Sequence, residues 1–119
     1  MKHIAYLFAP IAFALLLITS AQAETVSPRD ASYYVGTTLT VEGVVSQVTQ
    51  TNSGTTFINF GGRYPNHVFY AVIFQNIAGE FSALEFLEGK TVSINGTVEM
   101  YKGKPQIVII SPDQIEVRQ

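Results

Sequence analysis

Positive charge and aromatic rings occur together at two predicted turns of this chain. The residues are Arg63 and Tyr64 at the first turn, and Tyr101, Lys102 and Lys104 at the second. Cations contact phosphates and aromatic rings stack on bases, so these residue types are the ingredients of a surface for single-stranded nucleic acid. Three further residues would join this surface if they are the outward members of their strands: Phe57, Asn59 and Tyr70. The structural alternative is that the rings pack inward and the lysines only solubilise a glycine turn.

Residues suited to catalysis or metal binding are scarce. The chain has no cysteine, so it has neither a thiol nucleophile nor a cysteine-based metal site. His67 is the only histidine beyond residue 3, and a lone histidine at the start of a strand is typical of an exposed or hydrogen-bonded structural residue. The spacing of Glu80, Glu85 and Glu88 does not gather them on one helix face. We therefore expect a binding protein that is not an enzyme and that needs no metal or cofactor.

The first 23 residues have the pattern of a secretory signal peptide. Lys2 precedes an apolar run over residues 4–18, which Pro10 interrupts, and Ala21-Gln22-Ala23 matches the small-residue pattern at which such peptides are cut. A membrane anchor is the alternative, but a spanning helix needs about 20 apolar residues. The sequence therefore predicts cleavage before Glu24, a periplasmic or secreted location, and no stable membrane insertion afterwards.

Residues 24–119 are long enough for one small domain. The whole chain has a formal charge of −2, and removal of Lys2 leaves six basic residues against nine acidic ones, or −3. Nucleic-acid-binding domains usually carry a basic footprint. This balance argues against tight, non-specific binding of phosphate, although a local basic patch is still compatible with it.

A hairpin at the centre of the domain is the clearest structural prediction. Residues 55–60 and 67–74 are rich in aromatic and β-branched side chains, which favour strands, and residues 61–66 form a glycine-rich connection. Alternation along the two strands turns one set of side chains toward the core and leaves Tyr70 outside. The expected inward residues are Ile58, Phe60, Phe69, Ala71 and Ile73.

The rest of the chain predicts three more strands and one helix. A short helical start is expected near residues 27–36. The expected strands cover residues 38–49, 91–101 and 105–110, and the helix covers residues 78–87. Gly43 and Gly96 interrupt two of these strands, which indicates a bulge or a sharp bend at each.

Five strands with one short helix between the third and the fourth is the order of the OB-fold, a partly open Greek-key barrel. Residues 35–46 (V-G-T-T-L-T-V-E-G-V-V-S) and residues 87–117, which include Y-K-G-K-P-Q-I-V-I, resemble OB-fold domains of the nucleic-acid-binding, anticodon-binding-like class. Similar domains occur in exported bacterial proteins. The resemblance implies that oligonucleotides bind across the second and third strands and the loops joining strands one to two and four to five. On this layout the candidate binding residues share one side.

Two functions remain open on the sequence alone. The first is an exported, non-catalytic module that binds single-stranded DNA or RNA, or another oligomeric ligand. The second is an envelope module that docks a protein partner and binds no nucleic acid. The placement of Arg63, Lys102 and Lys104 favours the first function, and the acidic charge of residues 24–119 favours the second.

Overall fold

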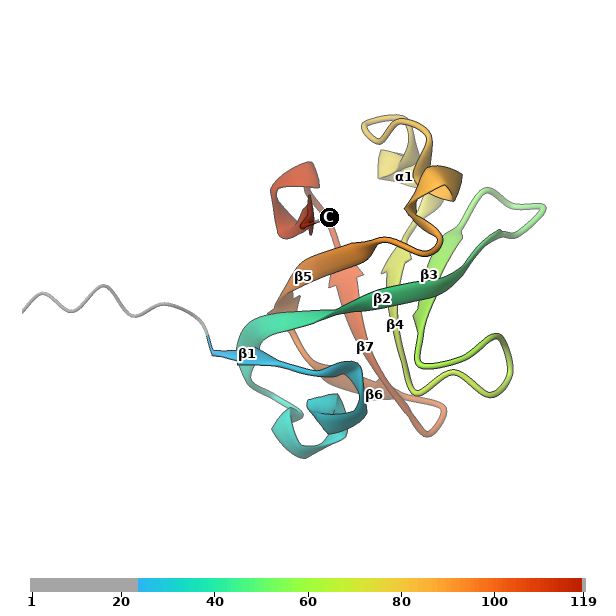
Figure 1. The fold of residues 1–119 in the computed structure, drawn as a ribbon. Coiled ribbons are helices and arrows are strands. Elements are labelled where there is room, and N and C mark those ends of the chain that lie inside the picture. The colour runs from blue at the N-terminus through green and yellow to red at the C-terminus, as the bar shows by residue number, and fades with distance from the viewer. Residues whose placement is uncertain (1–23, 119) are drawn as a thin grey trace, which may run out of the picture.

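The computed structural model describes residues 24–118, which form one strongly curved β-sheet with short helical turns at its ends (Figure 1). The predicted signal peptide lies outside the described residues. The strands are β1 (Thr25–Val26), β2 (Thr38–Gln50), β3 (Thr56–Phe60), β4 (Phe69–Ile73), β5 (Thr91–Thr97), β6 (Glu99–Tyr101), β7 (Lys104–Ile109) and β8 (Ile115–Val117). The helical turns are η1 (Pro28–Tyr34), α1 (Gln75–Ala78), η2 (Leu84–Leu87) and η3 (Pro112–Gln114), of which only α1 is α-helical.

The strand order is β6-β7-β4-β3-β2-β5-β8, and β1 pairs with β2 outside this path. β2 organises the sheet, because its first half pairs with β5 and its second half pairs with β3. β4 and β7 are parallel neighbours. β5 and β6 correspond to the single predicted strand over residues 91–101 and are separated only by Val98. They have different partners, because β5 pairs with β2 and β8 whereas β6 pairs with β7 at the other end of the sheet. Within residues 24–118, β6 and β8 do not pair, so the sheet stays open and does not close into a barrel.

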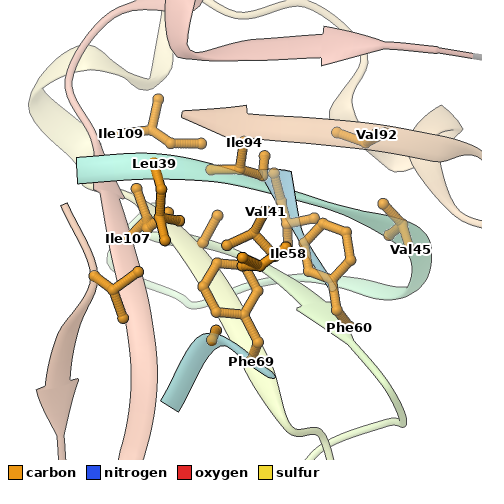
Figure 2. Packing of buried hydrophobic residues seen from close by; sticks show 14 of the residues in the cluster. Leu39, Val41, Val45, Ile58, Phe60, Phe69, Val92, Ile94, Ile107 and Ile109 are labelled. Atoms are coloured by element: carbon orange, nitrogen blue, oxygen red, sulfur yellow. The ribbon is translucent and has the colours of Figure 1, made fainter. Parts of the chain in front are cut away.

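The core lies inside the curve of the sheet. Figure 2 shows side chains of β2, β3, β4, β5 and β7 that point toward one another, among them Leu39, Ile94 and Ile107. The Phe60 and Phe69 rings lie 5.5 Å apart, centroid to centroid. All five residues predicted to face inward on the central hairpin are fully buried and belong to the core, whereas Phe57 and Tyr70 do not, so the predicted faces of its strands are confirmed.

Both interior glycines make room for a neighbour. A Cβ atom at Gly43 would lie 2.6 Å from Pro28 Cγ, and one at Gly96 would lie 2.5 Å from Ile107 Cγ2. Glycine is needed at Gly96 because β5 passes close to β7 there. The irregular register in β2 lies between Val45 and Gln47, so the predicted bulge is three residues further along than Gly43.

The predicted helix over residues 78–87 is wrong. The structure has two separate turns there, α1 and η2, and the backbone of Ala83 between them is left-handed with φ of 45°. Gly79 and Ser82 are poor helix formers, and a helix this short is marginal without tertiary support. Leu87 is buried and Phe81 packs against the core, so the apolar spacing reflects packing of separate turns.

Candidate functional site

A groove of about 290 Å³ lies on the outer face of β3, β4 and β7. Successive side chains of β3 and β4 alternate between the groove and the core, so Phe57 and Tyr70 face the groove while Ile58 and Ala71 face the core. The lining side chains are aromatic, aliphatic, hydroxyl or amide groups: Thr51, Ser53, Thr55, Phe57, Tyr70, Val72, Phe74, Tyr101 and Gln106. This composition offers stacking surfaces and neutral hydrogen-bonding groups.

Four rings form a continuous row that begins at the β3–β4 connection and ends in the groove. Tyr64 stacks on His67 with ring centroids 5.9 Å apart, His67 meets Tyr70 edge-on at 5.5 Å, and Tyr70 meets Phe57 edge-on at 5.7 Å. Such offset and edge-to-face contacts are the favoured geometries for aromatic pairs. Tyr64 is 73% exposed, whereas Tyr70 is only 6% exposed. Tyr70 lines the groove and so lies on the predicted outer face, but its neighbours cover most of the ring.

Side chains of β2 hold the β3–β4 connection in place. Gln47 Oε1 accepts a hydrogen bond of 3.0 Å from Asn59 Nδ2 and another of 2.8 Å from the Tyr64 backbone N–H. Ser46 Oγ accepts a 3.0 Å hydrogen bond from the Gly62 backbone N–H. The irregular register of β2 lies at these residues. Asn59 is 2% exposed, so it positions the connection and does not belong to the accessible binding surface for which it was predicted.

The three predicted cations do not form one patch. Lys104 Nζ donates a 2.7 Å hydrogen bond to the backbone oxygen of His67. Lys102 Nζ lies 5.3 Å from the centroid of the Tyr101 ring, which lines the groove. The Arg63 guanidinium is instead paired with the Glu88 carboxylate, with 3.8 Å between Nη1 and Oε1. Lys102 thus lies beside Tyr101 at the groove end, Lys104 pairs with Tyr101 in the sheet register but has its ammonium at the His67 carbonyl, and Arg63 is paired with an acid.

Several groove residues were not among the predicted site residues. Phe74 and Gln106 line the groove, and so do three hydroxyl residues at the β2–β3 connection, Thr51, Ser53 and Thr55. The family resemblance indicated that the connection between the first two strands takes part in binding, but the sequence did not indicate which residues of that connection do so. Across residues 24–118, no group of three or more His, Asp or Glu side chains is arranged to hold a metal ion.

The order of the long strands along the chain is the one that the sequence predicted, and solved structures have a similar fold. The chain resembles an asparaginyl-tRNA synthetase from Pyrococcus horikoshii with a TM-score of 0.54 and 16% identity, over 82% of this chain and 24% of that one. The fold is an OB-fold. The chain thus spans about a quarter of the length of that synthetase.

Weaker similarities are found to whole small domains. The second OB-fold domain of replication protein A from Methanococcus maripaludis aligns with a TM-score of 0.46 and 10% identity, over 79% of this chain and 96% of that one. A lipoprotein from Klebsiella pneumoniae with a provisional nucleic-acid-binding designation aligns with a TM-score of 0.43 and 15% identity, over 82% and 92%. No family model and no curated protein matches the sequence. In residues 24–118, no helix is long and apolar enough to cross a membrane.

The groove occupies the face that OB-folds use for ligands. In this architecture the second and third long strands, here β3 and β4, bind oligonucleotides or oligosaccharides together with two loops. Those loops are the β2–β3 connection, which supplies Thr51, Ser53 and Thr55 to the groove, and the β6–β7 turn next to Tyr101. The groove therefore lies on the same surface as the ligand-binding face of the OB-fold architecture.

His67 gives this surface a pH-dependent component of stability. His67 is 5% exposed, and its Nδ1 is buried without a hydrogen-bond partner in the described part of the chain. Burial, and after it the nearby Lys104 ammonium, lowers the pKa of His67 below its usual 6.5. Tyr64 and Tyr70 are the other titratable groups that pack on the imidazole. Protonation therefore places an unpaired charge in a buried position beside a second cation.

We expect the folded domain to lose stability as the pH falls from about 6.5 toward 5. The unfolded chain takes up the proton at the ordinary pKa while the folded chain resists it, so this contribution is constant above about pH 6.5 and declines below it. Urea denaturation midpoints measured across this window test the expectation. His67→Gln should flatten the decline, because His67 is the only histidine after residue 3. An equal decline in this variant would contradict the assignment.

Proposed function

We propose that residues 24–119 are an exported, non-catalytic module that binds single-stranded nucleic acid in the groove over β3, β4 and β7. The observation that carries this proposal is the aromatic lining of the groove by Phe57, Tyr70, Phe74 and Tyr101, in which Phe74 and Tyr101 are about half exposed while Tyr70 is mostly covered. Every base has a face that can stack on such rings, whatever the sequence of the strand. Lys102, beside the Tyr101 ring, and Lys104, which pairs with Tyr101 in the sheet register, would supply positive charge for the phosphates.

Export is proposed from the first 23 residues, whose pattern ends in Ala21-Gln22-Ala23. The protein should then lie in the periplasm or outside the cell. N-terminal sequencing of the exported protein is expected to begin at Glu24. A mature protein that still carries Met1 would show that no signal peptide is removed.

The affinity for a single strand should depend only weakly on salt. Each phosphate contact contributes about −0.7 to the slope of log K against log salt concentration, so three basic residues limit the slope to about −2. Because Arg63 lies beside the Glu88 carboxylate, which repels phosphate, whereas Lys104 contacts only a neutral carbonyl, we expect a value nearer −1.4, from about two contacts. Fluorescence anisotropy of a labelled oligonucleotide at several salt concentrations measures this slope.

Lysine variants identify which side chains are responsible for the salt dependence of the affinity. Lys102→Ala is the cleaner change, because Lys104 also holds the His67 carbonyl. We expect Lys102→Ala to weaken binding to all sequences alike and to flatten the slope by about 0.7. Lys90→Ala removes the same charge from an exposed residue that does not line the groove, and should leave the slope unchanged. Absence of binding by the unmodified domain even at low salt would refute the nucleic-acid proposal.

A protein partner is the second candidate function. It is favoured by the formal charge of −3 over residues 24–119 and by the engagement of Arg63 and Lys104 within the domain. On this alternative, an apolar segment of an envelope protein occupies the aromatic groove. A pull-down from envelope extract, made with the unmodified domain and with groove variants, tests this alternative. It is supported if the unmodified domain retains one specific protein that the groove variants do not retain.

A further inference from the structure

A polar pair stands at the β6 side of the groove. Glu99 on β6 and Gln106 on β7 are partners in the sheet register. Gln106 Nε2 donates a 3.1 Å hydrogen bond to Glu99 Oε1. Gln106 lines the groove, and Glu99 is exposed next to it. Within residues 24–118 no other hydrogen bond or ion pair involves the Glu99 carboxylate, which therefore keeps acceptor capacity for a ligand.

This carboxylate lies on the same face of the sheet as the groove. Residues 99 and 101 project from the same face of β6, since side chains two apart on a strand share a face, and Tyr101 lines the groove. Tyr70 lines the groove together with Tyr101, and its pKa is raised by burial first and then by Tyr101 and Glu99. A base that stacks on Tyr101 would therefore present its edge to Glu99.

A carboxylate is an unfavourable neighbour for a phosphate, because like charges repel. In a groove that binds nucleic acid, Glu99 is thus better suited to a base than to the backbone. An ionised carboxylate only accepts hydrogen bonds, and it can accept two in parallel. Guanine is the one common base with two adjacent donors on its pairing edge, N1–H and the N2 amine. Adenine, cytosine and thymine each place an acceptor beside their donor, which would face the second carboxylate oxygen.

We propose that Glu99, held by Gln106, makes the groove selective for guanine. Glu99 accepts hydrogen bonds from guanine N1–H and N2–H while the base stacks on Tyr101. The inference rests on the proposed binding of single strands and names the base that the groove prefers. Glu99 is on this account a specificity-determining residue, whereas Lys102 and Lys104 bind the backbone regardless of sequence.

The test compares short labelled thymidine strands that differ only in one central base. Fluorescence anisotropy at low salt measures the Kd of each strand for the unmodified domain. We expect the strand with guanine to bind about tenfold tighter than the all-thymidine strand, the usual discrimination of a two-bond base contact. Hypoxanthine lacks the N2 amine and should lose most of this preference. The base 7-deazaguanine keeps both donors and should retain it.

The variant Glu99→Gln tests the residue. It keeps the shape of the side chain but replaces one acceptor oxygen by a donor, so the preference for guanine should largely disappear. Its affinity for the all-thymidine strand should be unchanged or slightly higher, because a charge that repels phosphates is removed. Glu80→Gln makes the same chemical change at an exposed residue that does not line the groove and should preserve the preference.

The outcomes separate the two proposals. Equal binding of all strands by the unmodified domain would overturn the guanine assignment and leave single-strand binding intact. Loss of affinity for every strand on Glu99→Gln would also overturn it, because Glu99 would then support binding in general. Absence of binding to any strand would overturn both proposals.

Discussion

Replacing Phe60 with alanine is expected to lower the free energy of unfolding by about 3–5 kcal/mol, the usual range for a buried aromatic residue. Phe60 is fully buried and pairs with Val45 of β2 on one side and with Phe69 of β4 on the other. Its ring packs against that of Phe69 at 5.5 Å. The loss combines the transfer of an apolar ring with the cavity that neighbouring strands cannot fill. The urea denaturation midpoint of the purified domain measures it.

Phe86→Ala is the matched control for this change. It removes the same ring from a residue of η2 that is 69% exposed, so its effect on the midpoint should be small. A Phe60→Ala midpoint equal to that of the unmodified domain would mean that the inner and outer faces of β3 are reversed. The groove would then have to be placed on the opposite surface.

The central hairpin was predictable because its pattern is local. The alternation in residues 55–60 and 67–74 assigns each side chain to a face without knowledge of the rest of the fold. The same holds for the turn at Lys102 and Gly103, where β6 meets β7. The order of the long strands followed from these segments, and the fold followed from the order. The division of the predicted strand over residues 91–101 into β5 and β6 did not, because it depends on how far the sheet curves.

The candidate site was harder to predict because distant segments form it. Gln47 holds both Asn59 and Tyr64, and nothing near Gln47 in the sequence indicates this. Arg63 forms an ion pair with Glu88, which lies 25 residues further along the chain, and so Arg63 does not join the expected cluster of cations. His67 was expected to be exposed or hydrogen-bonded, yet its Nδ1 is buried without a partner in the described residues. The residue types predicted an aromatic surface with positive charge, and only the fold identified which side chains lie on that surface.

Tyr101→Ala should have the largest effect of any single change on binding of a single strand. Tyr101 is 52% exposed, lines the groove, and has Lys102 Nζ at 5.3 Å from its ring. Loss of one stacking ring costs about 1–3 kcal/mol of binding free energy, which corresponds to about 5- to 150-fold in Kd. Fluorescence anisotropy at fixed salt gives this ratio. The salt slope should barely change, because phosphate contacts determine the slope.

Two further tyrosines show how far the binding surface extends. Tyr33→Ala removes an exposed ring of η1 that does not line the groove, and should leave the Kd unchanged. Tyr64→Ala should cost about 1–3 kcal/mol if a base also stacks at the end of the aromatic row, since one face of Tyr64 packs on His67 and the ring is largely exposed. Equal affinities for the Tyr101→Ala and Tyr33→Ala domains would place the strand outside the groove. A loss with Tyr64→Ala and none with Tyr101→Ala would instead place it over the β3–β4 connection.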